Sequence, residues 1–417
     1  MKVFETESEM QGWLEKELND NNNEGLIDLI INNEDIEKYA SRNKPESIIK
    51  RSFITSLESL NILEIITANS NISNKRNEIL KPDILAYCSE RETLVIIELK
   101  NFPGATREAG TEISAYAAEL KTSLYNLSDG DIINVIISPC WPTLIKHHLY
   151  NSIVWQNKNI ICLEPCIYNG EIKLKIIDIP ELVQATLPET FSNEQLAGLT
   201  VCLYDDLQQQ ANPPLTKLHD HIDLMISSMN IISGKGEKLN SHGFAFLSKE
   251  EVGFGLSPYF IHVIGIAPFK CLERLLKTEN ISEYSDLPLA SQKYIDIYMD
   301  HSPHGYSSSL FNIAMSPYEI LKNICSPHIE GLTTWEEINK NIEKNWKPIY
   351  FTSWGIFKEL SIDVLTDYYK RGVFNIHLNS ATLGLDVVKR TIDNNHNYIE
   401  LLEINTEFFP ENYFEDE

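Results

Sequence analysis

The sequence lacks the long apolar runs that membrane-spanning helices need. None of its 417 residues lies in a run of about 18 apolar residues. The first ten residues, MKVFETESEM, also lack the basic and apolar regions of a signal peptide. With 43% hydrophobic and 23% charged residues, the composition is that of an ordinary globular protein. We therefore expect a cytoplasmic protein with no membrane partner.

Cysteine is also scarce. The seven cysteines are odd in number and widely separated, which fits a reducing compartment rather than a disulfide framework. Cys162 and Cys166 are four residues apart, but no second pair lies near them in the sequence. A zinc site needs about four such ligands, so we expect buried thiols here.

Positive charge is in deficit, since the formal net charge is −25. Residues 1–180 hold 18 Lys and Arg against 27 Asp and Glu, and the remainder holds 17 against 33. Proteins that grip a phosphate backbone usually present a basic surface, so tight and unaided binding to duplex DNA is disfavoured. A local basic strip in the first half is still possible, and its candidates are Arg42, Lys44, Lys50, Arg51, Lys75, Arg76 and Lys81.

The most informative stretch is KPDILAYCSERETLVIIELK, residues 81–100. The runs ILAYC and TLVIIELK have the β-branched and apolar content of strands, and the polar SERE between them predicts a β-hairpin. Because side chains alternate along a strand, Glu98 and Lys100 share one face. Asp83, at the start of the first strand, is expected beside Glu98. The alternative is an exposed hairpin whose charges face water.

Two carboxylates and an ammonium at one sheet edge indicate a particular chemistry. Carboxylate oxygens suit Mg²⁺, which keeps several waters and recruits one or two acidic ligands. A lysine beside them is able to orient a metal-activated water or to offset the charge that develops on a phosphate.

The set Pro82, Asp83, Glu98 and Lys100 resembles the motif of the PD-(D/E)xK nucleases, the restriction-endonuclease-like superfamily. The resemblance implies that Asp83 and Glu98 hold Mg²⁺ or Mn²⁺, with the Leu99 carbonyl as a further ligand. It also implies that Lys100 positions the attacking water.

Two flanking helices extend the resemblance. The spacing of ESEMQGWLEKEL predicts a helix over residues 7–18, with Thr6 and Glu9 forming a capping box. Related nucleases carry an extra metal-site acid on such a helix, and Glu7 is the candidate by position, with Glu9 as its rival.

The second helix is predicted over residues 106–124, where Glu112 and Tyr116 lie four residues apart on one face. Related nucleases often have glutamine at the position of Glu112 and tyrosine at that of Tyr116. We therefore expect both side chains to support the site, although a solvated helix face with a packed tyrosine is an equal alternative.

The order of predicted elements defines the fold class. A helix, three strands, a helix and a strand form the αβββαβ core that the resemblance implies, in an α/β domain of residues 1–180. The stretch 180–192, with two prolines, marks the boundary. Residues 193–417 are predicted to form a second, acidic and mainly helical (α+β) domain of unknown type. Its helices are expected near residues 215–229, 268–277, 289–299, 317–324, 335–346 and 385–391, and its strands at 242–248 and 259–266.

The resulting hypothesis is a metal-dependent endonuclease that hydrolyses phosphodiester bonds, in DNA more than in RNA. Bacterial proteins that join such a domain to an unfamiliar module often belong to restriction or phage-defence systems. The acidic second half predicts a protein partner or self-association. Two alternatives remain open at this point: a non-catalytic nuclease-fold subunit that binds or assembles, and an RNA nuclease.

Overall fold

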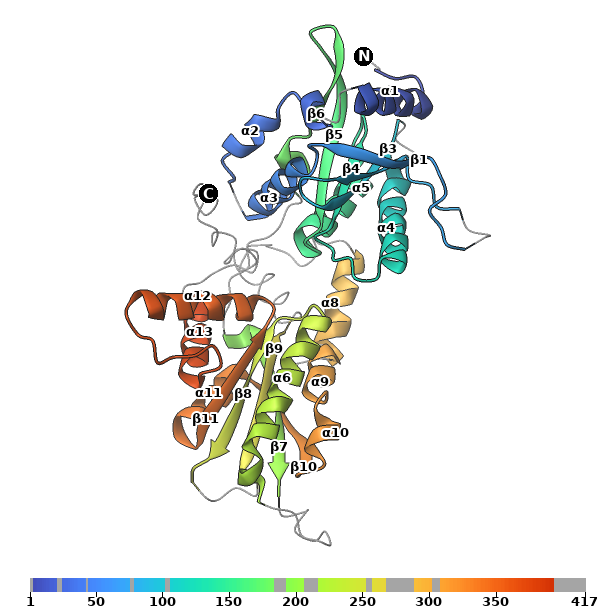
Figure 1. The fold of residues 1–417 in the computed structure, drawn as a ribbon. Helices are drawn as coiled ribbons and strands as arrows, with labels where there is room; N and C mark the ends of the chain where they lie inside the picture. Colours follow the sequence, from blue (N-terminus) through green and yellow to red (C-terminus); the bar gives the residue numbers. More distant parts are fainter. Residues whose placement is uncertain are drawn as a thin grey trace. The chain divides into compact units, whose positions relative to one another are not determined.

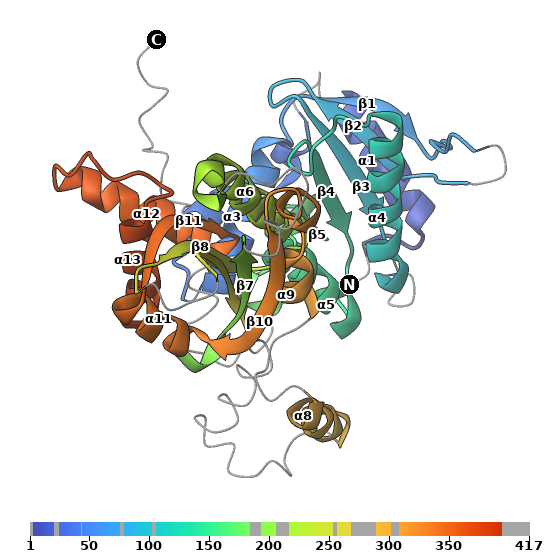
Figure 2. The ribbon, with the colours of Figure 1, turned by 90° about the horizontal axis from the view of Figure 1, so that it is seen from below.

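The chain forms two compact units in the computed structural model, residues 1–186 and residues 187–417 (Figures 1 and 2). The structure describes residues 3–20, 25–42, 44–75, 79–101, 106–183, 193–205, 217–252, 257–267, 289–301 and 308–393. No helix within these ranges has both the length and the apolar character to cross a bilayer. Most of the boundary stretch 180–192 and the helix expected at 268–277 lie outside the described residues.

The first unit is built on a six-stranded mixed sheet with the strand order β1-β2-β3-β4-β5-β6. Its strands are β1 (Leu63–Ala68), β2 (Ile84–Cys88), β3 (Thr93–Leu99), β4 (Ile132–Ile137), β5 (Asn159–Tyr168) and β6 (Glu171–Ile176). Strands β1 to β3 pair antiparallel, β3 to β5 pair parallel, and β6 returns antiparallel to β5. The central strand β4 is buried along its whole length, as its unbroken apolar run IINVII requires.

Helices surround this sheet. They are α1 (Glu7–Asp20), α2 (Asn33–Lys38), α3 (Lys44–Glu58), α4 (Thr106–Ser123) and α5 (Thr143–Tyr150), with a π-helical turn at Asn151–Trp155 and 3₁₀ turns at Ile27–Leu29 and Ile179–Glu181. Helix α4 packs on β3 and β4, and α3 packs on β5. The core beneath α4 joins Tyr116 and Leu120 of the helix to Ile96 and Ile132 of the sheet. The observed order of elements from α3 to β4 is therefore helix, three strands, helix and strand (Figure 1).

The second unit is built on a five-stranded sheet in which every neighbouring pair is antiparallel, with the order β10-β7-β9-β8-β11. Its strands are β7 (Leu196–Tyr204), β8 (Gly243–Glu250), β9 (Tyr259–Ile266), β10 (Ser326–Thr334) and β11 (Trp346–Trp354). Its helices are α6 (Ile222–Lys238), α8 (Leu289–His301), α9 (Ser308–Ala314), α10 (Tyr318–Leu321), α11 (Trp335–Lys344), α12 (Ile356–Lys370) and α13 (Ala381–Asp393), with 3₁₀ turns at Asn193–Gln195 and Leu218–His221.

Helices cover both faces of this sheet. Ala245 and Leu247 of β8 join the core that packs under α6, α9 and α10, whereas Phe244 and Phe246 join the core under α11, α12 and α13. Alternate residues of one strand face opposite sides, so the two cores lie on the two faces. The second unit is thus a layered α+β fold rather than a bundle of helices.

Residues 193–417 were predicted to form a mainly helical (α+β) domain with strands at 242–248 and 259–266, and the structure shows helices on both faces of a five-stranded sheet. Strands β8 and β9 were predicted, but β7, β10 and β11 were not. Strand β7 contains Ala197 and Gly198, and β11 contains Pro348, residues that are depleted in strands. Pro348 is tolerated because β11 is an edge strand whose register shifts between Pro348 and Tyr350.

Candidate active site

The β2–β3 hairpin brings the two predicted metal-binding carboxylates together. Ile84 of β2 pairs with Ile97 of β3 in an antiparallel register. Asp83, which precedes Ile84, therefore lies next to Glu98, which follows Ile97. The Leu99 backbone N–H donates a hydrogen bond of 2.7 Å to Oδ2 of Asp83. This bond fixes the Asp83 carboxylate at the end of β3, next to Leu99, whose carbonyl is the further metal ligand that the resemblance implies.

Lys100 lies where β3 ends. Its backbone N–H donates to the Ile137 carbonyl of the parallel neighbour β4, which holds the residue in register with the sheet. Its ammonium donates to Oε1 of Glu98 at 2.6 Å and also lies 2.7 Å from Oε2 of Glu112 on α4. The side chain is therefore held between one carboxylate of the sheet and one of the helix.

These charges are buried. Glu98 is 2% exposed and Lys100 is 5% exposed. The second carboxylate oxygen of Glu98, Oε2, is buried and receives no hydrogen bond from any residue that the structure describes. Burying an ion pair costs several kcal/mol of desolvation per ion, and apolar residues of similar size often replace such a pair without loss. Packing alone therefore does not account for charges at this position.

The electrostatics of the site oppose ionisation of both carboxyls. Burial raises the pKa of Asp83 to about 6, against the pull of the Leu99 N–H and the Lys100 ammonium. Burial also raises the pKa of Glu98 to about 9, and the nearby Asp83 adds to this shift. A divalent cation placed between the two groups would reverse this effect, because opposite charge favours the ionised forms.

The structure separates the two candidates on α1. The Glu9 carboxylate accepts a hydrogen bond from the Glu5 N–H at 2.8 Å, and the Glu9 N–H donates to Thr6 Oγ1 at 3.1 Å. Glu9 therefore belongs to the helix cap. Glu7 is half-buried, and its negative charge contributes to the raised pKa of Asp83. Of the two, Glu7 is the acid whose charge acts on the site.

Tyr116 and Gln11 hold the start of β2. The hydroxyl of Tyr116, on α4, donates to the Lys81 carbonyl at 3.0 Å, and Gln11 Nε2, on α1, lies 3.3 Å from the Asp83 carbonyl as a donor. Gln11 was not predicted from the sequence, although it lies one helical turn after Glu7. The four-residue spacing places both side chains on one face of α1, and that was the available signal.

The donor set fits one hard divalent cation. Asp83 and Glu98 supply carboxylate oxygens, and one of these, Glu98 Oε2, is buried without a hydrogen bond from a described residue. Mg²⁺ needs only one or two protein carboxylates because water completes its shell. Within the described ranges, no group of three or more His, Cys, Asp or Glu side chains is arranged to hold a metal ion. The fit therefore depends on these two carboxylates and on backbone or water oxygens.

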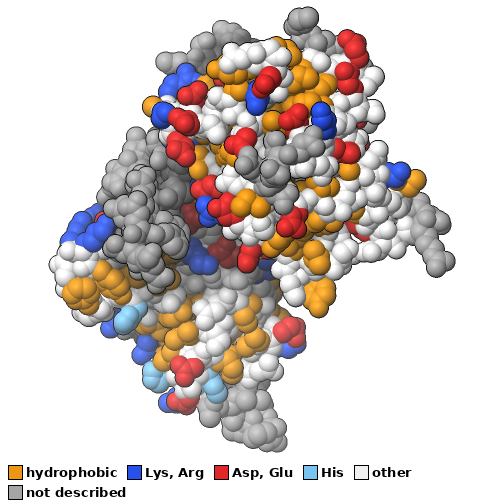
Figure 3. All heavy atoms as spheres, turned by 45° about the horizontal axis from the view of Figure 1, so that its top comes forward, with side chains coloured by type: hydrophobic (Ala, Val, Ile, Leu, Met, Phe, Trp, Pro, Cys, Tyr) orange, Lys and Arg blue, Asp and Glu red, His pale blue; other side chains and the backbone are white. Residues whose placement is uncertain are grey.

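The predicted basic strip is largely engaged within the protein. Arg42 pairs with Glu46 at 2.7 Å, Lys50 donates to the backbone carbonyls of residues 37 and 39, and Arg51 donates to Asn157. Arg76 and the side chain of Lys44 lie outside the described residues. On the face drawn in Figure 3, the visible described residues show acidic side chains scattered among basic ones rather than a continuous basic strip.

Comparisons of the chain with protein-family models, with curated proteins and with solved structures found no match.

Proposed function

We propose that the first unit is a metal-dependent nuclease that hydrolyses phosphodiester bonds, with DNA as the favoured substrate. The observation that carries the proposal is the grouping of half-buried Asp83 with buried Glu98 and Lys100 at one edge of the sheet. Asp83 accepts from the Leu99 N–H at 2.7 Å, and Lys100 donates to Glu98 at 2.6 Å. Burial raises the pKa of both carboxyls, and Asp83 raises that of Glu98 further, so keeping both groups ionised is costly without a cation between them.

The residues divide the chemistry among themselves. Asp83 and Glu98, with the Leu99 carbonyl, would hold Mg²⁺ or Mn²⁺, which when bound supplies Lewis-acid polarisation and a more acidic water. The Leu99 N–H keeps one oxygen of Asp83 fixed, so that its other oxygen is free to point at the ligand. The Lys100 ammonium orients the attacking water and offsets the negative charge that develops on the phosphate.

Three further residues would assist these. Glu112 holds the Lys100 ammonium from the side of α4 at 2.7 Å, and Tyr116 holds the strand that carries Asp83. Glu7 adds a third negative charge near Asp83, in a position to act through water or a second ion.

The charge distribution points to a partner. The protein has a net charge of −25, and among its described residues Arg42 pairs with Glu46 and Arg51 donates to Asn157, so positive charge with which to hold a polyanion is in deficit. We propose that a protein partner, or self-association through the acidic second unit, completes nucleic-acid binding, as in a restriction or phage-defence system.

The test is cleavage of plasmid, linear duplex DNA, single-stranded DNA and RNA with Mg²⁺ or Mn²⁺. The wild type is compared with Asp83→Asn, Glu98→Gln and Lys100→Ala. Glu64→Gln, on the outer strand β1, and Lys175→Ala, on the far edge strand β6, are the matched controls. We expect metal-dependent cleavage that falls at least about 100-fold in each site variant, which is the range for lost electrostatic stabilisation, and is unchanged in both controls.

Other outcomes distinguish the alternatives. Cleavage of RNA alone would identify an RNA nuclease. If the wild type is inert on every polymer and remains inert with a co-purifying partner, the nuclease proposal fails and a non-catalytic binding or assembly subunit replaces it. Cleavage that persists in Lys100→Ala and Asp83→Asn would place the activity elsewhere.

A further inference from the structure

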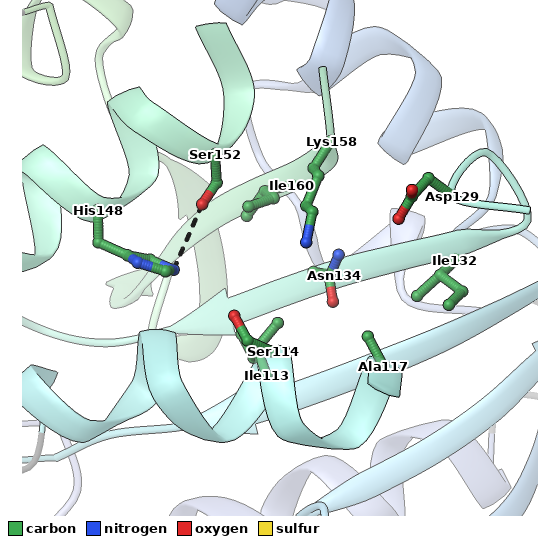
Figure 4. A pocket seen from close by; sticks show the side chains of 10 residues that line it. All are labelled: Ile113, Ser114, Ala117, Asp129, Ile132, Asn134, His148, Ser152, Lys158 and Ile160. Carbon is green, nitrogen blue, oxygen red and sulfur yellow. Dashed lines mark hydrogen bonds between the residues drawn. The ribbon is translucent and has the colours of Figure 1, made fainter. Parts of the chain in front are cut away.

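A second polar pocket lies in the first unit, away from the carboxylates. Its wall is formed by α4, β4, α5 with the π-helical turn that follows, and the start of β5 (Figure 4). Ser114, Asn134, His148, Ser152 and Lys158 direct polar atoms into it, above an apolar floor. None of the residues proposed for phosphodiester hydrolysis lines it.

Asn134 is the most buried polar group of this pocket. It is 3% exposed, and its Nδ2 donates to the Asn159 carbonyl at 3.3 Å. Its Oδ1 is buried and receives no hydrogen bond within the described part of the chain. A buried acceptor without a donor costs about 1–3 kcal/mol, so the side chain is suited to a ligand that brings an O–H or N–H.

Lys158 brings a positive charge to the same space. Its ammonium points toward the Asn134 amide (Figure 4), and it forms no ion pair with any described carboxylate. Asp129, the acidic residue at the pocket, is already paired with Lys121 at 2.7 Å. The pocket therefore contains an uncompensated cation that calls for an anionic ligand.

The rest of the pocket wall surrounds the imidazole ring of His148. The π-helical turn Asn151–Trp155 places Ser152 Oγ 3.5 Å from His148 Nε2. π-helical turns are rare and often occur at functional sites. A Cβ at Gly110 of α4 would lie 2.5 Å from the His148 ring, so glycine is needed at this position for the ring to lie against α4. Burial and the charge of Lys158 lower the pKa of His148, which keeps the ring neutral and leaves one ring N–H as a donor.

We propose that this pocket binds a small tetrahedral oxyanion that carries an O–H, and that inorganic phosphate is the ligand of this class. Its oxygens would accept hydrogen bonds from Lys158, Ser152 and His148, and its O–H would donate to Asn134 Oδ1. Inorganic phosphate keeps at least one O–H at neutral pH, whereas sulfate has none. The site thus requires both a negative charge and a donor, which distinguishes it from a generic anion site.

The test is calorimetric titration of the full-length protein with sodium phosphate and with sodium sulfate at pH 7 and constant ionic strength. We expect saturable binding of phosphate, with sulfate at least about tenfold weaker because the Asn134 acceptor stays unpaired. Lys158→Met should weaken both anions at least about tenfold through loss of a charged hydrogen bond. Asn134→Leu, which keeps the side-chain size, should remove the preference for phosphate over sulfate.

Lys175→Met, on β6, is the matched control and should bind phosphate as the wild type does. Circular dichroism and thermal melting of each variant establish that it is folded, and Asn134→Leu removes an unsatisfied acceptor, so we expect it to melt no lower than the wild type. The proposal is overturned if the wild type shows no saturable phosphate binding, or if Lys158→Met binds phosphate unchanged. Nuclease activity plays no part in these readouts, so the result is independent of the proposed function.

Discussion

The two sheets of this protein differ in how their buried titratable groups are accommodated. In the first unit, Glu98 and Lys100 are almost fully buried, and the Lys100 ammonium lies 2.6 Å from Oε1 of Glu98. In the second unit, His262 is fully buried in β9, where its Nδ1 lies 3.0 Å from Thr200 Oγ1 and its ring stacks on Phe260 and Trp346. Burial lowers the pKa of His262 to about 3, so this ring is neutral.

The difference teaches where function is to be sought. A neutral ring stacked between aromatic groups is a packing solution, and it leaves no charge to exploit. A buried carboxyl held by a buried lysine is a poor packing solution, because desolvation offsets much of the attraction. The contrast therefore singles out the edge of the first sheet as the place where chemistry accounts for residues that stability does not.

The largest effect is expected from Lys100→Met, which leaves the buried Glu98 carboxyl without its cation. Removing the charged donor leaves a buried carboxyl oxygen without its hydrogen bond, at a cost of about 3 kcal/mol. Amide exchange of β2 and β3 at pH 8 measures the free energy of local unfolding. The double variant Glu98→Gln with Lys100→Met is the control, and it should recover most of the loss. Equal losses in the single and double variants would contradict the pairing.

Apart from substitutions, the stability of the first unit is expected to fall as pH rises. The raised pKa values, about 6 for Asp83 and about 9 for Glu98, mean that the folded state keeps protons that the unfolded chain releases near pH 4. The free energy of unfolding therefore decreases between about pH 4 and pH 9, by about 1.4 kcal/mol per pH unit for each proton retained.

Amide exchange of β2 and β3 at pH 5, 7 and 8, corrected for intrinsic rates, measures this slope. Glu98→Gln should flatten it above pH 6, while Glu64→Gln on β1 should leave it unchanged. A stability that rises over this interval in the wild type would show that the carboxyls are ionised in the folded state.

The second unit is expected to show the opposite sign. Burial lowers the pKa of His262 to about 3. Below about pH 6.5 this histidine therefore binds a proton in the unfolded chain but not in the folded state. Stability of this unit is therefore lost as pH falls from about 6.5 toward 3, by about 1.4 kcal/mol per pH unit. Amide exchange of β9 between pH 4 and pH 7 measures the loss, and His262→Phe, which keeps the ring stack, should reduce it. If the free energy of unfolding of both units changes in the same direction with pH, the contrast between the two units is contradicted.

The smallest effect is expected from Tyr116→Phe. The ring still packs against Ile96 and Leu120, but the hydrogen bond to the Lys81 carbonyl is lost, at a cost of about 1 kcal/mol. Urea unfolding, monitored by amide exchange of β2, measures this loss of stability. Tyr125→Phe, whose ring is 85% exposed, is the matched control and should change nothing. A loss as large as that of Lys100→Met would mean that Tyr116 does more than hold β2.

Local sequence patterns predicted much of the secondary structure of the first unit. The β2–β3 hairpin, α1 and α4 were predicted close to their observed bounds, because each has its own periodicity or turn residues. The hairpin also specified the site: a short turn sets the register of two adjacent strands, so Asp83 had to lie next to Glu98.

Contacts between segments far apart in the chain were beyond such reasoning. Strand β10 pairs with β7, more than a hundred residues earlier, and neither strand was predicted. The choice of Glu7 over Glu9 depends on how α1 packs on the sheet, and the pocket around Asn134 and Lys158 joins α4, β4, α5 and β5.

The amino-acid sequence by itself determined the hairpin and the three charged residues at its edge, because alternation and turn length act over a few residues. Only the tertiary structure decided that Lys100 lies between Glu98 and Glu112 and that Gln11 and Tyr116 hold the strand of Asp83. It also decided that Asn134 Oδ1 receives no hydrogen bond from the residues that the structure describes. The physical reason is that hydrogen bonding and burial depend on which distant segments meet, and periodicity specifies a face without specifying its partner.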